Sequence, residues 1–336
     1  MKYSKEYPGK RELKLKKIGV AVIGVGFWGR NHARVYMEIP EAELIGVCDI
    51  DPKRAKEIAE RYGVEAYTDS RKLLKRSDVD AVSICTWTTT HAKETIRALK
   101  AGKHVLVEKP IASTIREAKQ IVQMAEMEEL VLMTGFIERF NPGVERVVKT
   151  INEGYIGDIV SATSRRVSEW PERIGDVGVV KDSAIHDVDM MRYIFGEDPQ
   201  TMFAKAGKLR HKHFEDYAQI MLTFSHGKTA FIEANWLTPY KVRKLIVTGS
   251  KGIVTLDYLS QEIIIETEEK TFIPRYKWEE PLKRELKHFI KCVIENKQPL
   301  VSGLDGLKAL IICEAALKSA AKGKSINLEK ILRNVD

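Results

Sequence analysis

Three side chains in the sequence have the types and spacing needed to remove a proton from a hydroxyl group. Lys109 lies in the run Glu108-Lys109-Pro110, directly after a short apolar stretch. Asp182 and His186 are four residues apart, so on a helix they share a face. A histidine is a natural general base near neutral pH, and a lysine ammonium can stabilise a developing alkoxide. These residues therefore predict chemistry at a carbon that carries a hydroxyl group.

Each of these side chains also has a structural interpretation. A lysine at the end of a strand is most often a solvated surface group. The expected helix 182–195 has an apolar side and a polar stripe with Asp182, His186, Asp189 and Tyr193. That pattern fits a capped helix with a solvated histidine as well as it fits a catalytic pair. The sequence also leaves open whether Asp182 orients His186 or binds the substrate, and whether Lys109 or His186 is the principal base.

A glycine-rich turn follows the first apolar run of the chain. Residues 18–23 form a β-branched apolar run, which ends in Gly24-x-Gly26-x-x-Gly29, and a helical pattern follows from Arg30. Gly24 can make a tight turn, Gly26 lets the backbone approach a pyrophosphate, and Gly29 lets helix and strand pack closely. The free N–H groups of the helix start then face the phosphates. This stretch, with Phe27 and Trp28 between the glycines, is expected to bind a dinucleotide.

An acidic residue ends the second apolar run. Asp49 follows residues 44–48 and stands 20 positions after Gly29. A carboxylate at that place accepts hydrogen bonds from the adenosine ribose and repels a 2′-phosphate, which favours NAD over NADP. Alternatively, Asp49 or Asp51 caps the helix 52–62. Asp51 fits this cap better because Pro52 follows it at the first helical position, so Asp49 remains for the ribose.

Strand and helix patterns alternate through residues 18–136. Six strands separated by helices predict an α/β fold, a Rossmann-type, doubly wound parallel sheet with a ligand site beyond the carboxyl ends of its strands. Thr90 is expected to cap a helix over 91–101. The polar residues at the ends of later strands are expected to border the nicotinamide; they are Thr86, Trp87, His91, Glu108 and Lys109. The bond from Lys109 to Pro110 is a candidate cis peptide.

The pattern changes in residues 137–336. Helices are expected over 142–152, 182–195, 281–296 and 304–322, and hairpin-like strands dominate between 218 and 273. This order predicts an α+β domain with a large, open, mostly antiparallel sheet that binds substrate. Because helices cover only one face of such a sheet, we expect the other face to be buried in a homodimer or homotetramer.

Composition and charge narrow the class of protein. The chain has 336 residues, 44% of them hydrophobic and 30% charged, which is typical of a soluble protein of two domains. It shows no apolar run of membrane-spanning length and no signal-peptide core, so we expect a cytoplasmic location without a membrane partner. The basic extension 1–17 has no aromatic residues within its cationic run, so nucleic-acid binding is not expected. We therefore expect the extension to be either a solvated tail or an arm that packs on a neighbouring subunit.

Metal chemistry is not expected. The four cysteines lie far apart, and no acid or cysteine completes a metal site with His211 and His213. The net charge of +8 is compatible with anionic ligands such as nucleotide sugars. Arginine side chains suit phosphates, so the run 138–142 and nearby arginines are candidates for substrate binding. The candidates are Arg139, Asn141, Arg166 and Arg173.

The glycine turn, Asp49, Glu108-Lys109-Pro110 and Asp182-x-x-x-His186 together resemble the glucose-fructose oxidoreductase / inositol dehydrogenase / MocA family. The resemblance covers the chain from about residue 18 to its end. Within the family, residues 135–142 and 173–180 look most like UDP-N-acetylglucosamine 3-dehydrogenases. The chain departs from many members at Asp176-Val-Gly-Val-Val-Lys181, where they have a glycine-rich run.

The resemblance implies hydride transfer between NAD and a sugar or polyol carbon. It assigns Lys109, Asp182 and His186 as the catalytic set, with a UDP-N-acetylglucosamine C3 hydroxyl as the expected substrate group. One alternative is a polyol or myo-inositol dehydrogenase. The other is an NAD-binding redox sensor without turnover, although a sensor has no need for Lys109 and His186 together.

Overall fold

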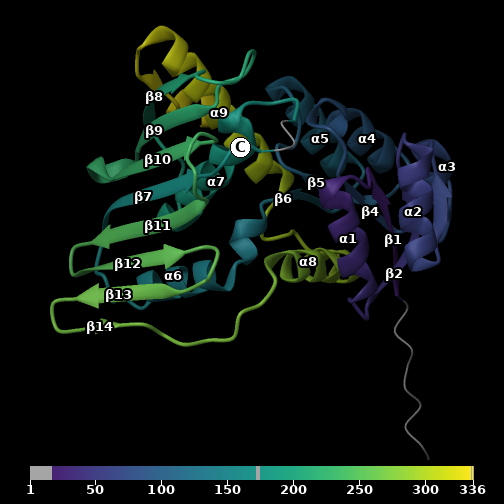
Figure 1. Cartoon of the computed structure of the whole chain (residues 1–336), viewed down its shortest axis with the longest axis horizontal. Helices are drawn as coiled ribbons and strands as arrows, with labels where there is room; N and C mark the ends of the chain where they lie inside the picture. Colours follow the sequence, from purple (N-terminus) through teal and green to yellow (C-terminus); the bar gives the residue numbers. More distant parts are fainter. Residues whose placement is uncertain (1–16, 172–174, 334, 336) are drawn as a thin grey trace, which may run out of the picture.

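The computed structural model describes residues 17–171, 175–333 and 335. The basic extension therefore lies outside the described residues, except for Lys17. The described chain forms two sheets that lie side by side, with helix α8 (Pro281–Glu295) between them and against α1 (Phe27–Met37) (Figure 1). None of the helices in the described ranges is long and apolar enough to cross a bilayer.

The first sheet has six parallel strands, as the alternating pattern predicts. Their order is β3-β2-β1-β4-β5-β6. The strand order reverses between β1 and β4, which is where such sheets bind ligands. Its strands are β1 (Ile18–Ile23), β2 (Ala42–Cys48), β3 (Glu65–Tyr67), β4 (Ala81–Ile84), β5 (His104–Glu108) and β6 (Leu132–Gly135). The connecting helices after α1 are α2 (Pro52–Tyr62), α3 (Ser70–Leu74), α4 (Thr88–Lys100) and α5 (Ile115–Met127).

Local capping sets several of these helix ends. Thr114 and Glu117 form a reciprocal capping box at the start of α5. The expectation for α4 is corrected: the helix begins at Thr88, with Trp87 at its N-cap, and Thr90 lies inside it. The reason is tertiary, because the Asp176 carboxylate accepts a hydrogen bond from the Thr89 N–H (2.6 Å). A distant acid thus satisfies an orphan donor that sequence reasoning assigns to a local cap.

The second sheet has nine strands in the order β14-β13-β12-β11-β7-β10-β9-β8-β15. Only β7 and β10 pair in parallel, so the sheet is mixed and mostly antiparallel, as predicted. Its longer strands are β7 (Ile159–Val167), β8 (Thr201–Gly207), β9 (Tyr217–Thr223), β10 (Thr229–Asn235), β11 (Val242–Gly249), β12 (Gly252–Asp257) and β13 (Ile263–Thr267). The short edge strands are β14 (Thr271–Phe272) and β15 (Ile326–Asn327). The sequence pattern did not reveal β8 or β15.

Helices cover one face of this sheet. They are α6 (Pro142–Asn152), α7 (Ile185–Phe195), α9 (Gly303–Lys322) and the short α10 (Glu329–Arg333). Side chains along β10 alternate accordingly, with Ala230 and Ile232 buried and Phe231 51% exposed. The 3-10 turn η1 (Ile137–Phe140) joins the two halves, and a π-helical turn η2 (Val180–Ala184) precedes α7.

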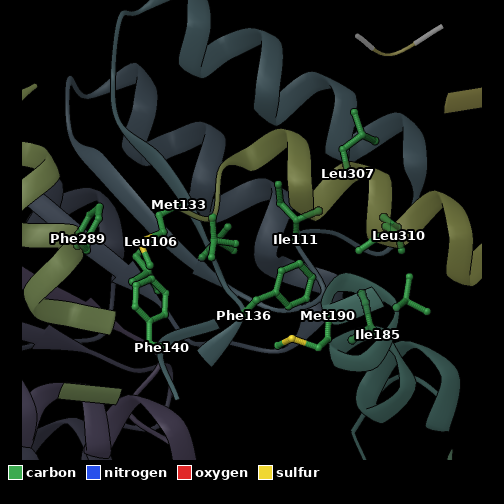
Figure 2. Close-up of a cluster of buried hydrophobic side chains, with 14 of the residues drawn as sticks. Leu106, Ile111, Met133, Phe136, Phe140, Ile185, Met190, Phe289, Leu307 and Leu310 are labelled. Carbon is green, nitrogen blue, oxygen red and sulfur yellow. The ribbon is translucent and has the colours of Figure 1, made fainter. Parts of the chain in front are cut away.

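A continuous apolar core connects the two halves. Figure 2 shows Ile111 and Phe136, which follow β5 and β6, beside Ile185 and Met190 of α7 and Leu307 of α9. All five side chains are at most 2% exposed. Because protein interiors are close-packed, this contact fixes the end of β5 relative to the start of α7. Lys109 and His186 are thereby held by one rigid body.

Candidate active site

A cavity of about 210 Å³ lies between the two sheets. Its walls come from the start of α1, the end of β5, η1, η2 with the first turn of α7, strands β7 and β11, and the loop before α8. The three residues of the expected catalytic set, Lys109, Asp182 and His186, all line the cavity. The catalytic set suggested by the sequence is therefore brought to one place, although 73 residues separate Lys109 from Asp182.

Lys109 is a buried strand-end lysine rather than a solvated one. Its side chain is 9% exposed, and Nζ donates to the Asp182 carbonyl oxygen (2.7 Å) and to Asp182 Oδ1 (3.0 Å). The Lys109–Pro110 peptide bond is cis, as the sequence suggested. Asp182 thus holds the ammonium group of Lys109 at the cavity wall.

His186 stands in the first turn of α7, with its ring edge-on to Phe136 at a centroid distance of 6.1 Å. Its Nδ1 makes no hydrogen bond within the described residues. Burial, reinforced by the positive charges of Lys109 and Arg166, lowers the pKa of His186 well below its usual value. The imidazole is therefore neutral near pH 7, which is the form that accepts a proton.

Asp182 is itself positioned from the second sheet. Ser183 Oγ donates to Asp182 Oδ2 (3.1 Å), and the buried Trp236 indole donates to Ser183 Oγ (3.1 Å). Asp182 and Ser183 both belong to the π-helical turn η2, and such turns are common at functional sites. The structure thus ties Asp182 to Lys109, whereas the sequence left open a role beside His186.

Behind Lys109 lies a buried network that sequence reasoning missed. His32 of α1 is 0% exposed and contacts Glu108 Oε1 and Ser83 Oγ (3.1 Å each), while Tyr36 contacts the same serine at 2.7 Å. Burial raises the pKa of Glu108, but the His32 hydrogen bond together with the nearby charges of His32, Lys109 and His91 outweighs burial, so the pKa is lowered overall. Glu108 is a support of the strand end here. The only feature of the sequence that could have indicated a role for His32 is its position three residues after Gly29.

The glycine turn fits a dinucleotide. Gly24 has φ +87°, and a Cβ on Gly29 would lie 1.8 Å from the Gly24 carbonyl oxygen, so both positions require glycine. A Cβ on Gly26, in contrast, would meet nothing within 4 Å. The N-terminus of α1 has no side-chain cap and no acid in its first turn, so its N–H groups are available to a phosphate.

The structure confirms that Asp51, rather than Asp49, caps α2. The Asp51 carboxylate caps α2 by accepting from the Lys53 and Arg54 N–H groups. Asp49 is 6% exposed and accepts from the N–H groups of Val25 (2.9 Å) and Asp51 (3.0 Å), with the Arg54 guanidinium beside it (3.2 Å). Asp49 thus connects the glycine turn to the end of β2.

The remaining cofactor candidates lie around this edge. Trp28 lines the cavity, while Phe27 and Trp87 are 54% and 57% exposed. Thr86 Oγ1 accepts from the hydroxyl of Thr90. His91 is buried, with its ring nitrogens 2.8 Å from the Pro110 carbonyl and 3.1 Å from the Thr86 carbonyl. It braces the turn that carries Lys109.

The candidate substrate residues separate into different positions. Arg139 is absent from the cavity lining; it forms buried ion pairs with Asp189 (2.5 Å) and Asp305 (3.1 Å). Asp189 is thus on the buried side of α7 rather than on an exposed polar stripe. The reason is that Arg139 and Asp189 compensate each other's charge in a site that is closed to water. Arg173 lies outside the described residues.

Arg166 and Asn141 do line the cavity, but their polar atoms are largely engaged. Arg166 donates to Asp187 (2.7 Å) and Glu138 (3.0 Å). The Asn141 amide donates to the Tyr258 carbonyl, and its oxygen accepts from Gly143 N–H. Sequence reasoning also missed the lining residues that come from β11 and the chain after it: Arg243, Tyr258, Leu259, Gln261, Trp278 and Pro281.

Comparison with known families identifies the class. Residues 18–136 match the model "Oxidoreductase family, NAD-binding Rossmann fold", and residues 144–255 match "GFO/IDH/MocA C-terminal domain". The chain therefore belongs to the Gfo/Idh/MocA oxidoreductase family, and its first sheet is an NAD-binding domain.

Among its relatives, the chain is 32% identical to a myo-inositol 2-dehydrogenase of Thermotoga maritima, with 93% of this chain and 99% of the relative covered. It is 32% identical to an inositol 2-dehydrogenase of Rhizobium meliloti, with 91% and 98% covered. The solved structure of the UDP-N-acetylglucosamine 3-dehydrogenase GnnA from Acidithiobacillus ferrooxidans has a TM-score of 0.84 at 27% identity, with 91% and 99% covered.

Proposed function

We propose that this protein oxidises a ring hydroxyl of a sugar to a ketone with NAD as hydride acceptor, and that UDP-N-acetylglucosamine is oxidised at C3. The observation that carries the proposal is the meeting of Lys109, Asp182 and His186 in one cavity with Trp28 of the glycine turn. A proton acceptor and a fixed cation beside a dinucleotide domain are the groups that alcohol oxidation requires.

Each group has a distinct part in the reaction. Bound NAD supplies the hydride-accepting carbon. His186, neutral because burial lowers its pKa, accepts the proton of the substrate hydroxyl. The Lys109 ammonium stabilises the negative charge that develops on that oxygen, and Asp182 fixes the ammonium through its 3.0 Å contact. We favour His186 as the base because Lys109 is held in an ion pair with Asp182, whereas His186 Nδ1 makes no hydrogen bond within the described residues.

The walls of the cavity support a sugar substrate. Trp28 and Trp278 both line it, and Trp278 is 55% exposed in the loop before α8. Indole rings offer broad apolar faces with a polar edge, which suit the C–H faces of a pyranose or a nucleotide base. The relation to GnnA supports a UDP-sugar.

A polyol dehydrogenase of the inositol type is the second candidate. It is favoured by the identity of 32% to the inositol dehydrogenases of two organisms. A redox sensor without turnover would not require Lys109 and His186 in one cavity.

We further propose that the open face of the nine-stranded sheet joins subunits into a homodimer or homotetramer. Phe231 and Ile246 are 51% and 37% exposed on it, and Met221 lies with them around a hollow. A cluster of exposed apolar side chains on one face of a protein is typical of a protein–protein interface. Sedimentation of the purified protein tests this: a monomer would contradict it.

The test of the main proposal is a substrate panel. The protein is incubated with NAD and, separately, with UDP-N-acetylglucosamine, N-acetylglucosamine, myo-inositol and scyllo-inositol, and NADH absorbance is followed. The product of any active sugar is then located by NMR at the oxidised carbon. Higher kcat/KM for an inositol would favour the second candidate. Tight NAD binding without turnover of any panel member would favour the sensor.

A further inference from the structure

Two cations stand at the start of β11, on the helix-covered side of the second sheet. Arg243 lines the cavity, and it pairs across the strands with Arg166 of β7. Lys241 is exposed and directly precedes β11, close enough to Arg243 for the Arg243 charge to lower its pKa. Neither residue was singled out from the sequence, because only the register between β7 and β11 places Arg243 beside the cavity.

The two paired arginines differ in their partners. Arg166 is 5% exposed and donates to both Asp187 and Glu138. Arg243 is 36% exposed; its only ion pair with a described residue is Glu138, at 3.5 Å, and it donates no hydrogen bond within the described ranges. Glu138 is already engaged by Arg166 at 3.0 Å. A guanidinium has five N–H donors, so Arg243 has most of its donors left for a ligand.

The local charge is unbalanced in the same place. Burial and the nearby Arg166 charge lower the pKa of Arg243. The Arg243 charge, followed by burial, lowers the pKa of Lys241. Arg243 also contributes to the lowered pKa of His186, so its charge lies close to the reacting groups. Two cations that repel each other at a cavity wall are stabilised by an added anion.

We propose that Arg243, assisted by Lys241 at the rim, binds an anionic substituent attached directly to the sugar ring and thereby selects charged sugars over neutral polyols. The shared chemistry is a phosphate or a carboxylate, because a guanidinium fork matches both. Arg243 lines the same cavity as Lys109 and His186, so the anion that it binds is carried on the ring whose hydroxyl group meets those residues. This inference rests on the proposed sugar oxidation and adds the charge of its substrate.

The test compares Arg243→Gln with wild type and with Lys287→Gln, which removes the same charge from an exposed position on α8. The substrates are UDP-N-acetylglucosamine and N-acetylglucosamine 1-phosphate for a ring phosphate, glucuronate for a carboxylate, and N-acetylglucosamine and myo-inositol as neutral sugars. Loss of charge-assisted hydrogen bonds is expected to raise KM for the preferred anionic sugar about ten- to a hundredfold in Arg243→Gln. We expect the loss of kcat/KM in Arg243→Gln to be at least about tenfold larger for the anionic sugar than for the neutral sugars, and Lys287→Gln to match wild type.

Binding of the same compounds to the NADH-loaded protein is measured by calorimetry, so that the inference is decided even without turnover. A ring phosphate and a carboxylate are distinguished by which compound loses affinity in Arg243→Gln. Equal loss for neutral and anionic sugars would overturn the inference, as would unchanged affinity for every anionic sugar. Oxidation of UDP-N-acetylglucosamine with unchanged KM in Arg243→Gln would overturn it while the proposed function stands. Binding of glucuronate through Arg243, without UDP-N-acetylglucosamine turnover, would support it while the proposed substrate fails.

Discussion

Replacing Lys109 by methionine is expected to abolish most turnover while leaving NAD binding intact. Methionine keeps the length and apolar stem of the side chain but removes the ammonium group that contacts Asp182 Oδ1 at 3.0 Å. Lys109 Nζ donates its hydrogen bonds to Asp182, whereas the glycine turn and Asp49, which are expected to hold the dinucleotide, contact each other. The variant therefore separates stabilisation of the transition state from binding of the cofactor.

The magnitude follows from the burial and partners of the ammonium group. Removing one preorganised donor to a developing oxyanion lowers kcat about 10²- to 10³-fold, or about 2.7–4 kcal/mol. In Lys109→Met the Asp182 carboxylate also loses its cation, and its negative charge then opposes the alkoxide. The double variant Lys109→Met/Asp182→Asn should therefore be more active than the product of the single losses, with a coupling of about 0.5–3 kcal/mol.

The assay measures kcat and KM by NADH formation with the best sugar of the panel, and NAD affinity by fluorescence titration. Lys100→Met, at the exposed end of α4, is the control for removal of a surface lysine charge. If Lys109→Met kept kcat within about tenfold of wild type, with normal NAD affinity, the ammonium group would have no role in the transition state. Additive losses in the double variant would show that Asp182 acts independently of Lys109.

Three further predictions concern other groups. His186→Asn should lower kcat about 10²- to 10⁴-fold, as for loss of a general base. Because burial lowers the pKa of His186, the acidic limb of the wild-type kcat/KM should be centred below pH 6.5, and a limb centred at or above pH 6.5 would contradict this. Asp49→Ser should lower the NAD/NADP ratio of kcat/KM at least about tenfold, because Arg54 is then free to meet a 2′-phosphate; an unchanged ratio would remove Asp49 from cofactor choice. Glu285 is 0% exposed with both carboxyl oxygens unpartnered among described residues, and burial raises its pKa well above the usual value. Above about pH 4.3 the folded state keeps this proton while the unfolded state releases it, so Glu285 destabilises the fold by about 1.4 kcal/mol per pH unit. Glu285→Met should therefore raise the urea midpoint of unfolding more at pH 7 than at pH 5. Equal increases at the two pH values would refute the reasoning.

The local patterns of the sequence determined much of this protein. The glycine turn, the apolar runs and the Thr114 cap depend on neighbouring residues alone, so the parallel first sheet and most helices could be predicted from them. Asp51 as the cap of α2 belongs here too, since Pro52 and the following N–H groups lie within one helical turn. Lys109, Asp182 and His186 could be selected because their types and short spacings indicate chemistry.

Tertiary structure alone decided which polar groups face the cavity. Arg139, Arg166 and Arg243 are indistinguishable as residue types, yet the first is closed in ion pairs with Asp189 and Asp305, the second is satisfied by Asp187 and Glu138, and the third retains its donors. The register between β7 and β11 places Arg166 and Arg243 side by side, whereas contacts of the turn η1 with Asp189 and Asp305 enclose Arg139. Both arrangements depend on contacts between residues far apart in the chain. Asp176 at α4 and His32 behind Glu108 follow the same rule. The residue type determines which chemistry a side chain can perform, but its partners are determined only when distant strands pair and the core packs.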